Sequence, residues 1–499
     1  MILIIVLIVT PLFFLIANGL DPDFGWHLYF GKYIVENHHL VTTQIGYNFF
    51  AANTTVDHQW LSNILLYLGY DNIGYVGLAI ISTLIIFIAF IVQYKLITPN
   101  VSRATVVISL MLMALPISIF VGGVRLQYLI LLGAALLIYI AKKIPRFRGR
   151  LLLYFLIFFL GNNLHSGFLF LSIIPAFLEY NIAQPFSKAW FQKYIILGAT
   201  IIVALALNPN GLGYWKLILD MLRDPIYQKN ISEWLPIYQK FPADFCLMIL
   251  PLTLITLPLI TNAVWKKIKI NELILLLIFF VLALKSVRNI PLFVILALPY
   301  FAAELEHELR LATNRKMFLL FFGGIVFVLY GTLMRQVPFG FTAVNIFERK
   351  IGYPSEGLTF YEKIKPANGN LLNNYGWGGY EIWKYPDTKI FIDGRGPQVG
   401  VGKDSTMLKE YLSFSSDDRT ITTQKLAEYN ITSTILSKPQ PAKLDWLNMI
   451  VAKVSNIDIS SFDNPQNNLI DYLKADPDWS LAYEDDISVI FIKKTELKN

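Results

Sequence analysis

Eleven long apolar stretches dominate the chain and limit what it can fold into. An α-helix needs about 20 apolar residues to cross a hydrocarbon core of about 30 Å. Only 15% of the 499 residues are charged and 55% are hydrophobic, against roughly 25% and 45–50% in soluble domains. The sequence therefore predicts an α-helical polytopic membrane protein of about 11 spans. The expected spans lie near residues 2–19, 74–94, 103–120, 126–141, 150–161, 166–181, 193–208, 244–263, 270–286, 290–304 and 316–335.

The first stretch lies where a cleaved signal peptide would lie. It has no basic residues before it, and its apolar run is longer than the roughly 7–15 residues of a signal peptide, so we expect a retained anchor. The single cysteine, Cys246, cannot form an internal disulfide. The composition excludes disordered, disulfide-rich and nucleic-acid-binding proteins.

Lysine and arginine are unevenly distributed among the segments that connect the spans. With a cytoplasmic N-terminus, five short inner loops hold 15 of these residues, whereas the longer outer segments before residue 336 hold nine. This asymmetry follows the positive-inside rule for an integral plasma-membrane protein. It places residues 20–73, 209–243 and the chain after about 336 outside the cytoplasm. The net charge of +7 divides into +10 for residues 1–335 and −3 for 336–499, so it reports orientation and identifies no partner besides membrane lipids.

The pattern changes after Gly352, where short strand-like segments alternate with turns and helices. We expect a transmembrane domain over residues 1–335 and a soluble extracytoplasmic α/β domain over residues 352–499. Strands are predicted at Asn370–Asn373, Lys389–Asp393, "ITSTILSK" and "SVIFIKK", a turn at "SLAYEDD", helices near 356–365, 404–412 and 422–429, and a helix or strand at Tyr380–Lys384.

Two glycine-containing segments of this domain are expected to form turns. The cluster of Gly376, Gly378 and Gly379 lacks both the G-x-G-x-x-G and the Walker pattern, so turn geometry is the favoured interpretation. The segment Asp393-Gly394-Arg395 follows an expected strand and is most simply a turn. A role for it in a site is the weaker alternative.

Two aspartates stand directly after the first span. Asp21 and Asp23 flank Pro22, which stiffens the backbone between them. Downstream, Trp26 and Phe30 begin an aromatic stripe at helical spacing, which predicts a short helix lying in the membrane interface. The aspartates are either a helix N-cap and a solvated loop charge, or groups of a reactive site.

Other polar side chains gather on the same predicted outer side. Asp57 and His58 close the first outer loop, and His165 interrupts the apolar run between two spans. Carboxylates and imidazoles can take a proton from a hydroxyl group or hold a divalent cation such as Mg²⁺ or Mn²⁺. Five of the six histidines are expected outside: His27, His38, His39, His58 and His165.

Three cations are predicted at the outer margins of spans. Arg125 lies in "GGVRLQ", and Lys285 and Arg288 lie in "LALKSVRNI". They either extend to lipid headgroups or bind a phosphate, and for the two arginines the phosphate is favoured. Glu233 in "ISEWLP" is either a solvated loop charge or a second carboxylate of the site.

The order of short motifs along nearly the whole chain resembles a family of largely uncharacterised bacterial proteins assigned to the GT-C class of membrane glycosyltransferases. The resemblance is carried by "DPDFGWHLYFGKYI", "VDHQWLSNILLY", "NNLHSGF", "LNPNGLGYW", "ISEWLP", "LKSVRNIPLF", "GWGGYEIW" and "FIDGRG". Gly25, where an aromatic residue is usual, and Ser166, where a glycine is usual, depart from the pattern.

The resemblance implies transfer of a sugar from a polyprenyl-phosphate carrier to a lipid, glycan or protein acceptor at the outer face of the membrane. It also implies that Asp23, or else Asp21, is the catalytic base or a metal ligand. Two alternatives remain: a transporter or flippase of lipid-linked glycans, and a non-catalytic scaffold for envelope glycans. A repeat-built transporter would show matching broken helices in its two halves, and the sequence has no such duplication.

Overall fold

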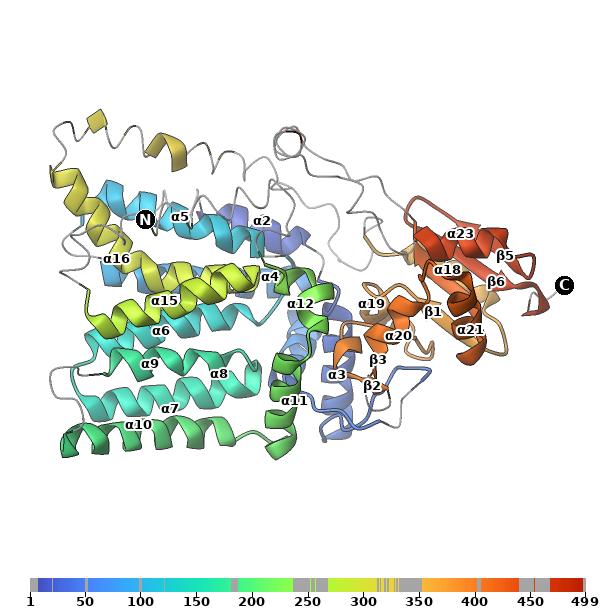
Figure 1. Ribbon diagram of the computed structural model, residues 1–499, viewed down its shortest axis with the longest axis horizontal. Coiled ribbons are helices and arrows are strands. Elements are labelled where there is room, and N and C mark those ends of the chain that lie inside the picture. Colours follow the sequence, from blue (N-terminus) through green and yellow to red (C-terminus); the bar gives the residue numbers. More distant parts are fainter. Residues whose placement is uncertain are drawn as a thin grey trace. The chain divides into compact units, whose positions relative to one another are not determined.

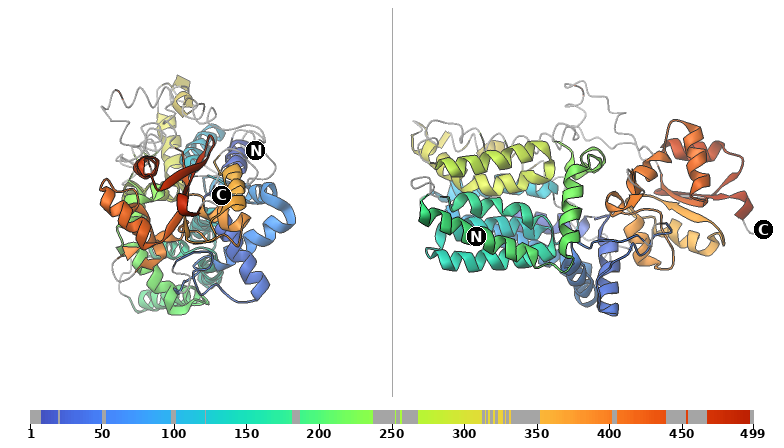
Figure 2. Two further views of the ribbon diagram at one scale, coloured as in Figure 1. Left: turned by 90° about the vertical axis from the view of Figure 1, so that its right-hand side faces the viewer. Right: turned by 60° about the horizontal axis from the view of Figure 1, so that its bottom comes forward.

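The computed structural model divides the chain into two compact units (Figures 1 and 2). Unit 1 comprises Met1–Gly19, Gly77–Trp215 and Tyr227–Phe341, and unit 2 comprises Leu20–Val76, Lys216–Ile226 and Thr342–Asn499. The first outer loop therefore shares a unit with the C-terminal residues. The residues that the structure describes are 8–19, 21–49, 53–97, 101–120, 122–180, 187–236, 268–311, 352–401, 405–438 and 467–496, with isolated residues between 252 and 331 and at 453.

Unit 1 is helical. Its sequence is rich in Leu, Ile, Phe and Ala, and a helix satisfies every backbone polar group within one apolar segment. In both views α6, α7, α10 and α15 run side by side (Figures 1 and 2). The bounds are α2 Thr10–Asn18, α4 Trp60–Ile97, α5 Arg103–Phe120, α6 Tyr128–Lys143, α7 Phe147–Leu164, α8 Phe168–Leu171, α9 Ile173–Leu178, α10 Lys188–Ala206, α11 Gly211–Arg223, α12 Ile226–Asn230, η2 Ser232–Trp234, α15 Ile270–Lys285, η4 Val287–Asn289 and α16 Ile290–Leu311, with α4, α11 and α12 shared between the units.

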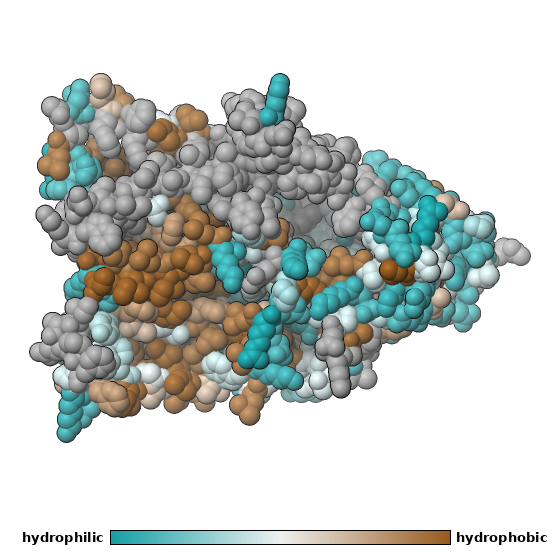
Figure 3. Space-filling view, in the orientation of Figure 1, coloured by the Kyte–Doolittle hydropathy of each residue, from teal (hydrophilic) through white to brown (hydrophobic). Residues whose placement is uncertain are grey.

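Three helical segments among the described residues are long and apolar enough to cross a membrane: Trp60–Ile97, Lys188–Ala206 and Val287–Leu311. Shorter apolar helices cover Arg103–Ser118 and Phe168–Leu178. The visible face of this unit is largely hydrophobic, whereas the C-terminal α/β residues are largely hydrophilic (Figure 3). The expected spans near 244–263 and 316–335 lie mostly outside the described residues, so the number of eleven stays a prediction.

Unit 2 contains a four-stranded sheet in the order β1-β4-β6-β5. β1 pairs with β4 in parallel, and the other two pairings are antiparallel. Strand β4 is buried at six of its seven positions, which makes it the centre of the core. The bounds are α3 Phe24–Asn37, α18 Ser355–Ile364, β1 Asn370–Asn373, α19 Gly378–Lys384, η6 Gly396–Gln398, β2 Gly400–Val401, β3 Ser405–Thr406, α20 Met407–Ser413, α21 Arg419–Glu428, β4 Ile431–Ser437, α23 Asn467–Ala475, β5 Trp479–Glu484, β6 Ser488–Lys493 and η8 Lys494–Glu496.

Most predicted elements of the C-terminal domain are confirmed, and two are wrong. Lys389–Asp393 is no strand, because the amides of Phe391 and Ile392 donate to the side-chain oxygen of Asn373 instead of a backbone ladder. Within this segment, Ile390 forms an isolated bridge with Tyr47. The segment "SLAYEDD" is mostly strand β5, because it pairs with β6 along the edge of the sheet before the turn begins at Asp485.

Candidate functional site

The two aspartates after the first span have different surroundings. Asp21 is buried, with 2% of its surface exposed, and its Oδ1 accepts the Asp23 amide at 3.1 Å. Asp23 is half-buried and stands at the N-cap position of α3, but its side chain forms no capping bond. Its Oδ1 instead accepts the indole N–H of Trp26 at 3.0 Å. Asp23 is therefore the more accessible carboxylate, and it is oriented by an aromatic side chain.

The stripe on α3 faces protein, contrary to the expected interfacial helix. Trp26, Phe30 and Ile34 are each less than 10% exposed, and α3 packs against α19. The reason is a close approach of two backbones. A Cβ built at Gly25 would lie 2.1 Å from the carbonyl oxygen of Gly379, so a larger residue at position 25 would separate the helices.

The glycine cluster serves this same packing. Gly376 is in a turn as predicted, and its amide donates to the Asn374 side chain at 2.8 Å. Gly378 and Gly379 belong to the first turn of α19. A Cβ at Gly379 would lie 2.7 Å from the carbonyl oxygen of Pro22. These glycines therefore allow contact with the segment that carries the aspartates.

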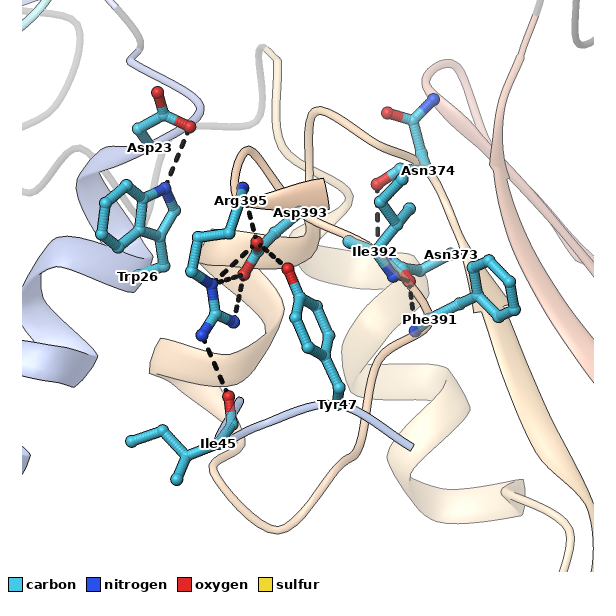
Figure 4. A network of polar contacts seen from close by, with 10 residues as sticks. All are labelled: Asp23, Trp26, Ile45, Tyr47, Asn373, Asn374, Phe391, Ile392, Asp393 and Arg395. Atoms are coloured by element: carbon cyan, nitrogen blue, oxygen red, sulfur yellow. Dashed lines mark hydrogen bonds and ion pairs between the residues drawn. The ribbon is translucent and has the colours of Figure 1, made fainter. Parts of the chain in front are cut away.

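The segment Asp393-Gly394-Arg395 forms a buried ion-pair network that the sequence interpretation underrated (Figure 4). Asp393 accepts hydrogen bonds from the Arg395 guanidinium at 2.6–3.0 Å and from the Tyr47 hydroxyl at 2.5 Å. Arg395 Nη1 also donates to the carbonyl oxygen of Ile45 at 3.1 Å. Both charged residues are at most 3% exposed. The turn therefore fastens the first outer loop to the C-terminal residues.

Three aromatic rings surround the Arg395 guanidinium. Its Cζ lies 4.4 Å from the ring centroid of Tyr47, 4.6 Å from that of Phe30 and 5.9 Å from that of Trp26. Although burial opposes the charge, the Asp393 carboxylate raises the pKa of Arg395 above its ordinary value. The cation is thus permanently charged and held in place. Sequence reasoning had one usable signal: a charged pair flanking a glycine in an otherwise apolar segment.

Asp57 takes part in a second buried network of unit 2. Its carboxylate accepts the Gln59 amide at 3.1 Å and the Asn63 side-chain amide at 2.8 Å. Because Asn63 donates to Asp57, its oxygen faces His27 Nδ1 at 2.5 Å, which therefore carries the proton. Burial raises the pKa of Asp57 to about 6, against the opposing effect of these hydrogen bonds. His58 lies 3.0 Å from Gln59 through its Nε2.

The cations of unit 1 are arranged around Glu233. Arg125 forms an ion pair with Glu233. Arg288 lies over the ring of Trp234 at 4.7 Å, and the Ser286 hydroxyl donates to the Glu233 carbonyl oxygen at 3.1 Å. The loop between α15 and α16 thereby joins the segment of Glu233. This cluster unites two arginines, one carboxylate and one aromatic ring.

Two further predicted site residues have local explanations. Lys285 is exposed at the end of α15, as expected for a side chain that extends to lipid headgroups. His165 follows α7, and its Nδ1 accepts the Gly167 amide at 2.9 Å. That bond closes the turn into α8. Neither arrangement requires a ligand.

The described residues do not assemble a metal centre. Within that part of the chain, no three His, Cys, Asp or Glu side chains form a group able to hold a metal ion. The Oδ1 atoms of both Asp21 and Asp23 already accept hydrogen bonds from the protein. A divalent cation held by Asp21 and Asp23 therefore stays a proposal, and we assign no catalytic step to one.

No protein-family model and no curated protein matches the chain. Several solved structures are similar in fold. An Archaeoglobus fulgidus oligosaccharyltransferase, tethered to an acceptor peptide with the NVT sequon, is 13% identical with a TM-score of 0.49, over 84% of this chain and 65% of that one.

Two other similar structures are also transferases. ArnT from Cupriavidus metallidurans, bound to undecaprenyl phosphate, is 11% identical with a TM-score of 0.48, over 98% of this chain and 97% of that one. The arabinofuranosyltransferase AftD from Mycobacteria is 12% identical with a TM-score of 0.47, over 97% of this chain and 40% of that one. Since every TM-score is below 0.5, these likenesses say nothing of the activity of this chain.

Proposed function

We propose that the chain is a membrane glycosyltransferase that moves a sugar from a polyprenyl-phosphate donor to a hydroxyl-bearing acceptor at the outer face of the membrane. The observation that carries the proposal is the state of Asp23. It is a half-buried carboxylate oriented by the Trp26 indole and placed directly after the first apolar segment. A positioned carboxylate of this kind is suited to general-base catalysis.

In the proposed reaction the acceptor hydroxyl attacks the anomeric carbon of the donor sugar. Asp23 takes the proton of that hydroxyl, because an alcohol is too weakly acidic to ionise at neutral pH. The bond between the anomeric carbon and the phosphate oxygen breaks, and its electron pair leaves with the polyprenyl phosphate. A single displacement of this kind inverts the anomeric centre.

The leaving phosphate needs positive charge, and the Arg125 and Arg288 cluster is our proposed source. Guanidinium groups bind phosphate oxygens through charge-assisted, often bidentate hydrogen bonds. Glu233 and Trp234 hold the two arginines in the same cluster.

The test is sugar transfer by the purified full chain. The donors are undecaprenyl-phosphate-linked glucose, mannose and arabinofuranose, each radiolabelled, with extracted membrane lipids and glycans as acceptors. Asp23→Asn is expected to lower the rate by roughly 10²–10⁴, the usual contribution of a general base. The matched control is Asp387→Asn, which changes an exposed aspartate of the same unit. Retained transfer by Asp23→Asn would show that Asp23 is not the base.

The same assay addresses the proposed divalent cation. Transfer is measured in EDTA and again after Mg²⁺ or Mn²⁺ is added back. A metal that neutralises a leaving phosphate would make the rate depend on this addition. A rate unchanged by EDTA is the expected result if the arginines supply the charge.

A further inference from the structure

The Asp393-Gly394-Arg395 turn also contacts the Asp23 carboxylate, a contact that is not needed to link the two segments. The backbone of Gly394 lies directly against the Asp23 carboxylate. A Cβ built at position 394 would lie 1.7 Å from Asp23 Oδ1 and 3.3 Å from Trp26 Nε1. Real Cβ atoms do not approach other atoms as closely as 1.7 Å. Any residue other than glycine would therefore push the carboxylate, the turn or both out of place.

The next residue of the turn controls the other group that holds Asp23. Trp26 donates its indole N–H to Asp23, and the Arg395 guanidinium stands against the Trp26 ring. A cation near an aromatic ring stabilises one position of that ring. In Figure 4 the Trp26 ring lies below the Asp23 carboxylate, and Arg395 lies to the right of the ring. A shift of Arg395 would therefore move the Trp26 ring, and a shift of Trp26 would move the Asp23 carboxylate that it binds.

Arg395 itself has little freedom. Its Nε and Nη2 bind Asp393, its Nη1 binds the Ile45 carbonyl oxygen, and the guanidinium is buried. A lysine would keep the charge but cannot reproduce this fixed fork of donors. The planar geometry of arginine therefore fixes the guanidinium beside the Trp26 ring.

We propose that Arg395 is a positioning residue: through Trp26 and Gly394, the C-terminal turn sets the orientation of the carboxylate of Asp23 in the first outer loop. The inference rests on the proposed function only for the chemical use of Asp23. The contact between the turn and the carboxylate stands independently of it. Residues more than 350 positions apart then build one reactive group.

The test measures Asp23 directly. The full chain in detergent is treated with a water-soluble carbodiimide and an amine, and the labelling rate of each carboxyl group is followed by mass spectrometry. The variants are Arg395→Lys, Trp26→Phe and Gly394→Ala. The matched control is Gly400→Ala, because a Cβ at Gly400 meets nothing within 4 Å.

We expect the labelling rate of Asp23 to change by about three-fold or more in each of the three variants, because the loss of a donated hydrogen bond changes both the pKa and the exposure of a carboxyl group. Trp26→Phe keeps most of the packing and removes the N–H, so its effect separates orientation from unfolding. In Trp26→Phe the Asp23 carboxylate loses a donated hydrogen bond, which favours its protonated form. The acid limb of the pH profile of sugar transfer should therefore move to higher pH. Gly400→Ala should match the wild type.

Equal Asp23 labelling in the wild type, Trp26→Phe and folded Arg395→Lys would overturn the proposal. If Arg395→Lys does not fold, Trp26→Phe and the pair Gly394→Ala and Gly400→Ala decide. If the variants alter the labelling of Asp23 but the wild type transfers no sugar from the three donors, the positioning role stands and the proposed function is rejected. If the wild type transfers sugar but the variants label Asp23 at the wild-type rate, only the positioning role is rejected.

Discussion

Two arginine clusters, one in each unit, are held in opposite ways. In unit 2, Arg395 is 3% exposed, and its donors bind Asp393 and the Ile45 carbonyl oxygen. In unit 1, the side chain of Arg125 is 15% exposed and faces a Glu233 that is 31% exposed, while Arg288 lies over Trp234. The first cation is enclosed by protein groups. The others are held at the margin of the solvent.

This difference separates two tasks of the same residue type. A buried guanidinium that is saturated by protein acceptors fixes geometry, since moving it would expose an unpaired charge to a medium of low polarity. A guanidinium that is held by one partly exposed carboxylate, or by one aromatic face, keeps water and ligands within reach. We therefore expect changes at Asp393 and Arg395 to affect stability first, and changes at Arg125 and Arg288 to affect donor binding first.

The largest expected effect comes from breaking the buried pair. Asp393→Ala leaves Arg395 buried without its carboxylate and should lower the free energy of unfolding by about 3–5 kcal/mol. Thermal unfolding in detergent measures it. The double variant Asp393→Ala/Arg395→Met is the control, because it removes both charges, and it should recover part of the loss. A single variant as stable as the wild type would contradict the view that this pair is structural.

The next effect tests the other arginine environment. Arg288→Ala should raise the KM for the polyprenyl-phosphate donor by about 10- to 100-fold, the equivalent of one lost hydrogen bond to a charged group. Stability should change little, because the guanidinium contacts one face of Trp234. Arg288→Lys keeps the charge without the fork and should fall between the two. An unchanged KM would return Arg288 to a role at lipid headgroups.

Local sequence patterns predicted much of this molecule. Apolar stretches near the length of a membrane span predicted the helical unit, and β-branched runs such as "ITSTILSK" predicted β4 and its neighbours. The predictions for two short segments, residues 389–393 and 480–486, were wrong. Strand β5 is defined by its pairing with β6, a contact between separate segments that no local pattern encodes.

The candidate site was predictable only in part, for the same reason. Asp21 and Asp23 stand out because carboxylates are rare beside an apolar span. Arg395, by contrast, gains its importance from Tyr47, Ile45 and Trp26, which are distant in sequence. The partnership of Arg125 with Glu233 likewise joins residues 108 positions apart. Such contacts follow from tertiary packing, which periodicity and propensity do not reveal.

Unit 2 contains another buried carboxyl group, that of Glu381, which lacks the partner that Asp393 has in Arg395. Glu381 in α19 is fully buried, and among the described residues neither of its side-chain oxygens has a hydrogen-bond partner. Burial, with smaller contributions from Glu362 and Asp393, raises the pKa of Glu381 well above its ordinary value. The folded chain therefore keeps a neutral acid here.

The sign of the resulting pH dependence follows from linkage. Because the folded pKa is raised, the contribution of Glu381 to stability is complete below the unfolded pKa and is lost as pH rises through the folded pKa. Glu381→Gln stays neutral at every pH, so its melting temperature relative to the wild type should increase between pH 5 and pH 8. Glu428→Gln, at an exposed glutamate of α21, is the control. A difference that does not vary with pH would show that folding does not raise the pKa of Glu381.

The smallest expected effect concerns the carboxylate that distinguishes Arg125 from Arg395. Glu233→Gln removes a negative charge from a partly exposed ion pair, and such pairs contribute only about 0.2–1 kcal/mol. The melting temperature should therefore hardly change, in contrast to Asp393→Ala.

If Glu233 occupies a position that a donor phosphate takes on binding, its neutralisation should lower the donor KM by about two- to five-fold, the same energy expressed as affinity. The effect should shrink in high salt, because exposed charges are screened. A large loss of stability in Glu233→Gln would mean that Arg125, like Arg395, is a structural cation, and the donor phosphate would then rest on Arg288 alone.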